Sequence, residues 1–279
     1  MKVVLTGASG FIGGYVLAEL LDRGTDVVVA TRNPGVFDTN QQAKVVTLDI
    51  SAPGEDLYDR LDRPDVLIHL AWDGLPNYHS LHHFETELPA QYHFIKKAVE
   101  SGLSSVVIAG TCFEYGMQAG ELTEKTICQP ENAYALAKDT LRRQLQLLTK
   151  TTSFNLTWAR LFYMYGSRQQ SNSLFAQLRS AVQRGDKVFN MSKGEQLRDY
   201  LPVETVASAL VKLSERQNDA DIVNICSGKP VSIRALVESW LEHYGWDIQL
   251  NLGYYPYPDY EPLAFWGSTD KLVKLVGAM

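Results

Sequence analysis

Tyr134 and Lys138 lie four residues apart in a segment that predicts a helix from Pro130 to Lys150. On a helix this spacing places both side chains on the same face. A free tyrosine titrates near ~10, and a lysine ammonium one turn away stabilises the phenolate and lowers the phenol pKa. The pair could therefore transfer a proton to or from a substrate, and the ammonium could also bind ribose hydroxyls. The alternative is an ordinary pair on a helix surface.

A glycine-rich turn near the N-terminus is the second chemical signal. The apolar run Lys2–Thr6 predicts a strand, and Gly7, Gly10 and Gly13 follow at a spacing of three before a helix that runs to Arg23. Glycines allow a tight turn and a close approach of backbone N–H groups to a phosphate, which a helix N-terminus attracts. The spacing differs from G-x-G-x-x-G, and glycine turns also occur for steric reasons. We nevertheless expect this turn to bind a dinucleotide.

Buried strands alternate with helices through the first 166 residues. We expect strands at 2–6, 26–31, 44–48, 65–70, 105–109 and 154–160, and helices at 14–23, 54–63, 81–101 and 130–150. This alternation is typical of a parallel sheet with right-handed crossovers, in which ligands bind at the carboxyl ends of the strands. We therefore predict an α/β protein, a Rossmann doubly wound parallel sheet with a smaller C-terminal substrate-binding lobe.

The pattern loosens beyond Gly166. Later elements are expected as helices at 173–184, 203–216 and 232–244 and strands at 187–190, 197–201 and 221–225. The predicted domains are a dinucleotide-binding domain at 1–166, with return segments from 203–225, and a mainly substrate-binding lobe at 167–279.

Composition excludes several classes of partner. The 279 residues carry a net charge of −6 without a block of Lys or Arg, which argues against nucleic acid. No apolar run approaches the ~18 residues of a membrane span, so we expect no membrane partner. The three cysteines are unpaired by count and show no C-x-x-C spacing. Together with a first strand that begins at Lys2, this leads us to expect a cytoplasmic protein.

Arg32 stands where the second strand ends. An acidic residue at this point would bind the 2′-hydroxyl of an NAD ribose, but the chain has Thr31 and Arg32. An arginine can form charge-assisted hydrogen bonds to a 2′-phosphate, which favours NADP over NAD. The alternative is a solvated surface arginine.

Four motifs occur together in a fixed order: Thr6-Gly7-x-x-Gly10-x-x-Gly13, His69-Leu-Ala71, Thr111-x-x-x-Tyr115-Gly116 and Tyr134-x-x-x-Lys138. With them the chain resembles the extended short-chain dehydrogenase/reductases, the NAD-dependent epimerase/dehydratase superfamily. The resemblance implies that Tyr134 is the catalytic acid or base, that Lys138 is its partner, and that Thr111 binds the reacting oxygen. It also implies cofactor contacts from Gly7, Ser9, Gly10, Phe11, Ile12, Gly13, Asp49, Ile50, Leu70, Ala71, Trp72 and Leu161, beside Tyr134 and Lys138.

The second half resembles the branch of this superfamily that acts on nucleotide-linked sugars. Gln196-Leu-Arg198-Asp199-Tyr200-Leu-Pro-Val203 is similar to its Q-x-R-D-[FY]-x-x-V segment, in which the arginine faces the diphosphate. A guanidinium fork suits two phosphate oxygens, although Arg198 and Asp199 could instead form a surface turn. The other substrate contacts that the resemblance implies are Thr111, Cys112, Phe113, Tyr163, Asn172, Ser173 and Met191.

Departures from the family pattern narrow the reaction. The 4,6-dehydratases place Asp-Glu after the catalytic threonine, where this chain has Cys112 and Phe113, so dehydration is disfavoured. Tyr163 replaces an asparagine that touches substrate, and Glu87 replaces a helix asparagine near the nicotinamide. A second diphosphate arginine is expected near the C-terminus, yet no arginine follows Arg234.

A group of histidines raises the question of a metal site. His79, His82, His83 and His93 have spacings that could bring ligands together on a helix, but no carboxylate or cysteine set completes a site. We expect no bound metal.

These features predict an NADPH-dependent reductase of a nucleotide-activated 4-keto-6-deoxy sugar, linked to dTDP or GDP. The alternatives are an NAD-dependent nucleotide-sugar 4-epimerase and a non-catalytic dinucleotide sensor. A reductase of a carbonyl compound without a nucleotide stays open if Arg198 does not contact phosphate. Family likeness implies a homodimer through the helices at 81–101 and 131–150.

Overall fold

The computed structural model describes residues 1–37, 42–216, 219–257 and 261–278. Within them, seven strands form one parallel sheet in the order β12-β7-β5-β4-β1-β2-β3. The direction of this order reverses between β1 and β4, which creates a crevice at the carboxyl ends of the strands. The bounds are β1 (Lys2–Thr6), β2 (Asp26–Thr31), β3 (Lys44–Thr47), β4 (Val66–His69), β5 (Ser105–Thr111), β7 (Asn155–Leu161) and β12 (Asp221–Ile225).

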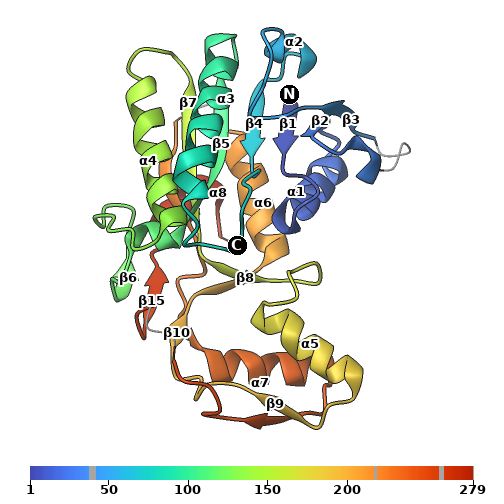
Figure 1. The fold of residues 1–279 in the computed structure, drawn as a ribbon, viewed down its shortest axis with the longest axis vertical. Coiled ribbons are helices and arrows are strands. Elements are labelled where there is room, and N and C mark those ends of the chain that lie inside the picture. The colour runs from blue at the N-terminus through green and yellow to red at the C-terminus, as the bar shows by residue number, and fades with distance from the viewer. Residues whose placement is uncertain (38–41, 217–218, 258–260, 279) are drawn as a thin grey trace.

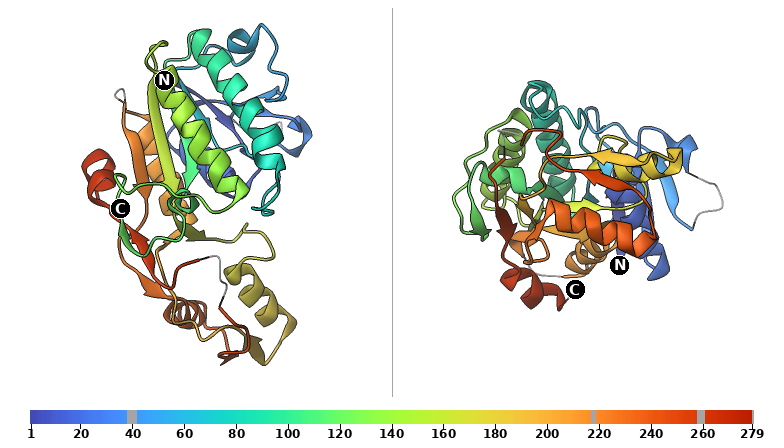
Figure 2. Two further views of the ribbon diagram at one scale, coloured as in Figure 1. Left: turned by 60° about the vertical axis from the view of Figure 1, so that its left-hand side comes forward. Right: turned by 90° about the horizontal axis from the view of Figure 1, so that it is seen from below.

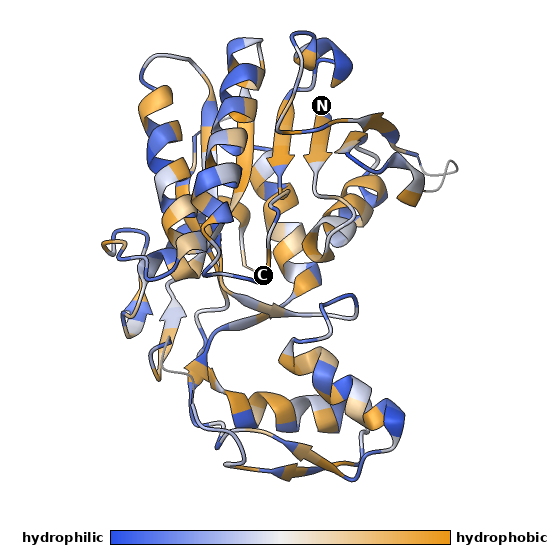
Figure 3. Ribbon diagram, viewed as in Figure 1, coloured by the Kyte–Doolittle hydropathy of each residue, from blue (hydrophilic) through white to orange (hydrophobic). Residues whose placement is uncertain are grey.

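Helices cover both faces of this sheet (Figures 1 and 2). Alternate residues of each strand point to opposite faces, so Val3 and Leu5 join one apolar core and Val4 joins the other. Figure 3 shows the resulting hydrophobic strands at the centre of the molecule. One face carries α1 (Phe11–Asp22), α6 (Val203–Ser214) and α8 (Asp270–Val276), and the other carries α2 (Leu57–Arg60), α3 (Leu88–Glu100) and α4 (Ala133–Leu148). The predicted α/β Rossmann fold is confirmed.

A smaller lobe lies beyond the carboxyl ends of the strands (Figure 1). It contains α5 (Leu174–Arg184), α7 (Ile233–Tyr244) and the parallel pair β9 (Val188–Asn190) and β14 (Gln249–Asn251). Serine N-caps and left-handed glycines fix both helices: Ser173 and Ser232 accept backbone hydrogen bonds at the start, and Gly185 and Gly245 end them. The lobe has its own apolar core, centred on Phe175, Leu178, Val237 and Trp240.

Short paired segments join the lobe to the sheet. Their bounds are β6 (Gly120–Leu122) with β15 (Phe265–Gly267), β8 (Tyr163–Tyr165) with β11 (Tyr200–Pro202), and β10 (Leu197–Arg198) with β13 (Val231–Ser232). Three single turns complete the elements: η1 (Pro34–Val36), η2 (His83–Glu87) and η3 (Cys112–Tyr115). None of the helices in the described ranges is both long and apolar enough to cross a bilayer.

Two expected helices differ from the structure. The helix expected at 54–63 is only one turn, α2, and the long helix at 81–101 is divided into the π-helical turn η2 and α3. Pro89 explains the division, because proline lacks an N–H donor and is tolerated in the first turn of a helix rather than in its interior. Most of the two- or three-residue strands were not expected, because such segments have no periodic pattern.

A buried ion pair ties β5 to β7. The carboxylate of Glu114 is fully buried and accepts hydrogen bonds from the Thr111 backbone N–H, the Trp158 indole and the Arg160 guanidinium, at 2.9, 2.9 and 2.7 Å. Arg160 is 1 % exposed and also packs over the ring of Tyr115. Glu114 therefore neutralises a buried guanidinium and positions the end of β5.

We expect Glu114→Gln to destabilise the fold by about 3–5 kcal/mol, because it leaves the charge of Arg160 buried without its counter-ion. Urea unfolding measures the change. Glu121→Gln, the same substitution at an exposed position of β6, is the matched control and should change stability by less than about 0.5 kcal/mol. A similar stability for Glu114→Gln and wild type would contradict the role of the pair.

Candidate functional site

A cavity of about 880 Å³ lies between the carboxyl ends of the strands and the small lobe. It extends from the glycine turn to Trp240 of α7, so both lobes contribute to its wall. The structure brings most of the residues predicted for the site to this one cavity. Those that line it are Gly7, Gly10, Phe11, Ile12, Gly13, Leu70, Trp72, Thr111, Cys112, Phe113, Tyr134, Leu161, Tyr163, Asn172 and Ser173.

The glycine turn leaves no room for side chains. Gly7 has φ +76°, and a Cβ there would lie 2.7 Å from the backbone nitrogen of Ala71. A Cβ on Gly13 would lie 2.0 Å from the carbonyl oxygen of Gly7. Strand β1, the turn and α1 are thus in backbone contact, and the N-terminus of α1 faces the cavity. This arrangement fits the pyrophosphate of a dinucleotide.

Thr111 and Tyr134 meet at the wall of the cavity. Thr111 ends β5 and caps η3, where its Oγ1 accepts the N–H of Phe113 at 3.3 Å. Tyr134 lies in the first turn of α4, and its backbone N–H donates to the carbonyl of Tyr78 at 3.0 Å. The Thr111 hydroxyl lies close enough to the phenol of Tyr134 to oppose the rise in its pKa. A carbonyl oxygen placed beside them could therefore be bound by both hydroxyl groups.

Burial governs the titration of Tyr134, and here the structure differs from the sequence-based expectation. The side chain is 8 % exposed, and burial raises the pKa of its phenol well above the ordinary value. The charge of Lys138 does not outweigh this effect, since its Nζ lies 5.9 Å from the centroid of the Tyr134 ring. The phenol consequently stays protonated at neutral pH, the form that can donate a proton.

Lys138 is almost fully buried beneath the cavity and is 3 % exposed. Its Nζ donates to the carbonyl of Ala109 at 2.9 Å. Burial lowers the pKa of Lys138 to about 7, although the carboxylates of Glu114 and Glu87 favour the charged form. Its proton is therefore exchangeable near neutral pH.

A hydrogen-bond chain holds the turn after β4. His69 lies between Thr6 and Gln91, and burial lowers the pKa of His69 to about 3, so the imidazole is neutral. Gln91 donates to the Ala71 carbonyl at 3.2 Å and to Glu87 at 2.9 Å. These contacts fix the backbone of the His69-Leu-Ala71 motif beside the glycine turn.

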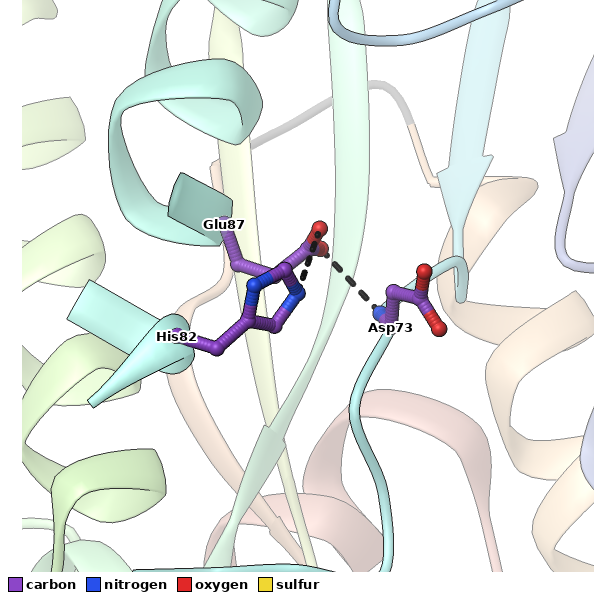
Figure 4. Close-up of side chains that lie close together, drawn as sticks. All are labelled: Asp73, His82 and Glu87. Atoms are coloured by element: carbon purple, nitrogen blue, oxygen red, sulfur yellow. Dashed lines mark hydrogen bonds and ion pairs between the residues drawn. The ribbon is translucent and has the colours of Figure 1, made fainter. Parts of the chain in front are cut away.

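Glu87 also closes a small cluster with His82 and Asp73 (Figure 4). Its Oε2 accepts the backbone N–H of Asp73 at 3.1 Å, and its Oε1 lies 3.7 Å from His82 Nε2. The ligand atoms of Asp73, His82 and Glu87 lie within 4.8 Å of one another, so two carboxylates accompany His82, which the sequence did not indicate. Through these contacts Glu87 holds the turn that follows β4. The absence of a bound metal stays a prediction.

Arg198 does not line the cavity, although most of the other residues predicted to bind substrate do. Its side chain is 2 % exposed, and Nη2 forms an ion pair with Glu261 at 2.9 Å. The other carboxylate oxygen of Glu261 accepts the hydroxyl of Tyr163, which does line the cavity. Among the described residues that line the cavity, none is a lysine or an arginine. Glu261 thus links Arg198 to Tyr163 and neutralises its charge.

The remaining predicted residues lie outside this cavity. Ser9 lines a neighbouring pocket along α1, and Ala71 contributes backbone to the turn. Arg32 is 64 % exposed, 3.5 Å from Asp73, and Asp49 is exposed with its carboxylate bonded to Ser51. Ile50 packs on the core and Met191 is buried in the core of the lobe.

The sequence did not indicate several other residues that line the cavity. The turn from Asp73 to His79 forms one side, and Tyr200, Phe175 and Trp240 form the far wall in the lobe. Glu261 was missed as well. These residues belong to no motif, and their roles depend on contacts between distant segments.

We expect Lys138→Met to raise the melting temperature at pH 6. A lysine pKa of about 7 in the folded protein lies below the unfolded value of 10.5, so the unfolded state binds more protons between these pH values. Native Lys138 therefore lowers stability at acidic pH, and stability rises as the pH increases from 7 to 10.5. The gain from Lys138→Met should shrink over this window in melting curves. Lys150→Met, at an exposed position, is the control; a gain that grows with pH would refute the burial effect.

Comparison with known proteins places these features in a family. The model of the NAD dependent epimerase/dehydratase family matches residues 3–226. The dTDP-6-deoxy-L-talose 4-dehydrogenase (NAD(+)) of Aggregatibacter actinomycetemcomitans is 30 % identical and is aligned over 96 % of this chain and 100 % of its own. The dTDP-4-dehydro-6-deoxyglucose reductase of Escherichia coli is 23 % identical over 85 % of this chain and 80 % of its own.

Solved structures show the same fold. MoeE5 in complex with UDP-glucuronic acid and NAD has a TM-score of 0.82 at 23 % identity, with 99 % of this chain and 93 % of that chain covered. TunA, an NAD-dependent NDP-hexosamine 5,6-dehydratase, has a TM-score of 0.84 at 21 % identity, with 100 % and 91 % covered. The members of this family are NAD(P)-dependent enzymes that act on a CH–OH or keto group. The chain therefore belongs to the NAD dependent epimerase/dehydratase family of extended short-chain dehydrogenase/reductases.

Proposed function

We propose that the protein is an NADPH-dependent reductase of a nucleotide-activated 4-keto-6-deoxy sugar, linked to dTDP or GDP. The observation that carries this proposal is that Thr111 and Tyr134 share the wall of one cavity, which begins at the glycine turn. The names of two relatives, a 6-deoxytalose 4-dehydrogenase and a 4-dehydro-6-deoxyglucose reductase, describe the same chemistry at C4 in opposite directions.

The proposed mechanism assigns a separate task to each side chain. A bound nicotinamide supplies the hydride for C4. Thr111 orients the C4 carbonyl, and Tyr134, which burial keeps protonated, donates its proton to the carbonyl oxygen as the C4 alcohol forms. Lys138 stabilises the resulting phenolate. Gly7, Gly10 and Gly13 would hold the pyrophosphate, together with the other cofactor contacts inferred from the sequence.

Support for NADPH comes from Arg32. Its guanidinium is exposed at the end of β2, and its ion pair among the described residues is a long contact of 3.5 Å with Asp73, so it is available for a 2′-phosphate. The relative from Aggregatibacter actinomycetemcomitans is named as an NAD(+) enzyme. The assay described below, repeated with NADH in place of NADPH, tests this choice.

The proposed assembly is a homodimer in the cytoplasm. α3 and α4 lie side by side on one face of the sheet, and α4 exposes Leu136 and Leu147. These exposed apolar side chains of α4 support an interface between copies. Cys112, Cys128 and Cys226 are free thiols, which fits a reducing compartment.

We expect the purified protein to oxidise NADPH when mixed with dTDP- or GDP-linked 4-keto-6-deoxyhexoses, followed by the absorbance of the reduced nicotinamide. Tyr134→Phe should lower kcat by roughly 10²–10⁴-fold and spare NADPH binding, because it removes only the proton donor. Tyr92→Phe, on α3 and outside the cavity, is the matched control.

Other outcomes of the same experiment identify the alternatives. Stoichiometric NAD that co-purifies with the protein, without a need for external hydride, would favour a 4-epimerase. Dinucleotide binding without turnover in both wild type and Tyr134→Phe would favour a sensor. No nicotinamide oxidation with any of these sugars would defeat the reductase.

Arg198 is the proposed ligand of the substrate diphosphate, and Glu261 competes for it. We expect Glu261→Gln to bind dTDP roughly tenfold more tightly, since one charge-assisted hydrogen bond contributes about 1.5–3 kcal/mol. Isothermal titration calorimetry measures the affinity. Glu238→Gln, which makes the same charge change at an exposed pair with Arg234, is the control. Unchanged or weaker dTDP binding in folded Glu261→Gln would assign Arg198 a structural role only.

A further inference from the structure

The ammonium of Lys138 has an aromatic face as its closest neighbour on one side. Nζ lies 3.9 Å from the centroid of the Trp72 ring. Among the described residues, the carbonyl of Ala109 is the only group that accepts a hydrogen bond from this nitrogen. An ammonium carries three N–H donors, so this hydrogen bond leaves two of them without a hydrogen-bond acceptor among the described residues, and the indole face lies against the same nitrogen.

The indole itself is fixed at its edge. Its Nε1–H donates to Nδ1 of His83 at 3.1 Å, and Nε2 of His83 lies 2.8 Å from the carbonyl of Asn77. Because Nε2 must donate to that carbonyl, Nδ1 is free to accept from the indole, and the imidazole is neutral. His83 is fully buried. The ring of Trp72 also packs edge-on against Tyr134, at 5.9 Å between centroids.

The carboxylates near Lys138 already have other partners. Glu114 of η3 is bonded to Arg160 and Trp158, and Glu87 of η2 is bonded to Gln91. They act on Lys138 only through space and favour its charged form.

The other titratable groups that face Lys138 give no counter-charge. His69 of β4 is neutral because burial lowers its pKa to about 3, and Tyr134 on the same helix is kept as a neutral phenol by burial, which raises its pKa. Beside the carbonyl of Ala109, the face of Trp72 is therefore the electron-rich surface that contacts the ammonium.

We propose that Trp72 is a positioning residue for catalysis, whose ring holds the Lys138 ammonium by a cation–π contact and keeps it charged beneath Tyr134. The catalytic meaning of this contact rests on the proposed function, in which Lys138 stabilises the phenolate of Tyr134. The contact opposes the cost of burying a charge in a site where no anion touches it. His83 and Asn77 hold the indole in the orientation that this contact needs.

The test is a direct titration of Lys138. NMR of protein with ¹³C-labelled lysine follows the Cε shift with pH, and the resonance of Lys138 is assigned by its loss in Lys138→Met. Trp72→Leu, which has no aromatic face, should titrate about one pH unit lower than wild type, because a desolvated cation–π contact is worth about that much. Trp72→Phe keeps a face and should show a smaller shift. Trp246→Leu, in the small lobe, should leave the titration of Lys138 unchanged.

The pH profile of turnover provides a second readout. Since the reaction needs the charged lysine, the alkaline limb of kcat/KM should move to lower pH in the order wild type, Trp72→Phe, Trp72→Leu. Equal titration of Lys138 in wild type and both variants would overturn the proposal. If Trp72→Leu does not fold, the titration of Lys138 in Trp72→Phe alone is compared with that in wild type, and equal titration overturns the proposal. A shifted titration in a protein that reduces none of the sugars would uphold the contact and reject the proposed function.

Discussion

The cost of burying charge constrains this structure more than any other single factor. The cavity lies against a layer of buried and partly buried charged side chains: Glu114, Arg160, Lys138 and the pair of Arg198 and Glu261. An isolated charge in such surroundings is expensive, so each of these groups has a counter-ion, a carbonyl or an aromatic face. The partners come from separate elements. Satisfying these charges therefore fixes how the strands, the turn after β4 and the small lobe fit together.

The same constraint sets the protonation of Tyr134 and Lys138. Burial raises the pKa of Tyr134, so its phenol stays protonated, and lowers the pKa of Lys138, so its proton is exchangeable near neutral pH. One environment therefore shifts the two pKa values in opposite directions. Thr111 is held at the edge of this environment by Glu114, through its backbone N–H. The buried ion pair of Glu114 and Arg160 thus positions the end of β5, where Thr111 meets the cavity.

The glycine turn adds a steric constraint to the electrostatic one. Gly7 and Gly13 permit the backbones of β1, α1 and the turn after β4 to touch, and larger residues would separate them. The crevice of the sheet then opens directly onto the N-terminus of α1. The lobe closes the opposite side with aromatic residues such as Phe175 and Trp240. A cavity between these walls has room for an extended ligand that spans both parts.

The sequence by itself determined the sheet, the helices that cover it, the glycine turn and the motif residues, because each is encoded by local periodicity or by spacing within one segment. It predicted that Thr111 and the glycine turn share one site, because the carboxyl ends of parallel strands must meet at one edge, and the family resemblance added Tyr134. Only the tertiary structure decided what surrounds them. The neutralisation of Arg198 by Glu261, the indole beneath Lys138 and the raised pKa of Tyr134 all depend on contacts between residues far apart in the chain. Burial and charge pairing are properties of the assembled fold, and no local pattern records them.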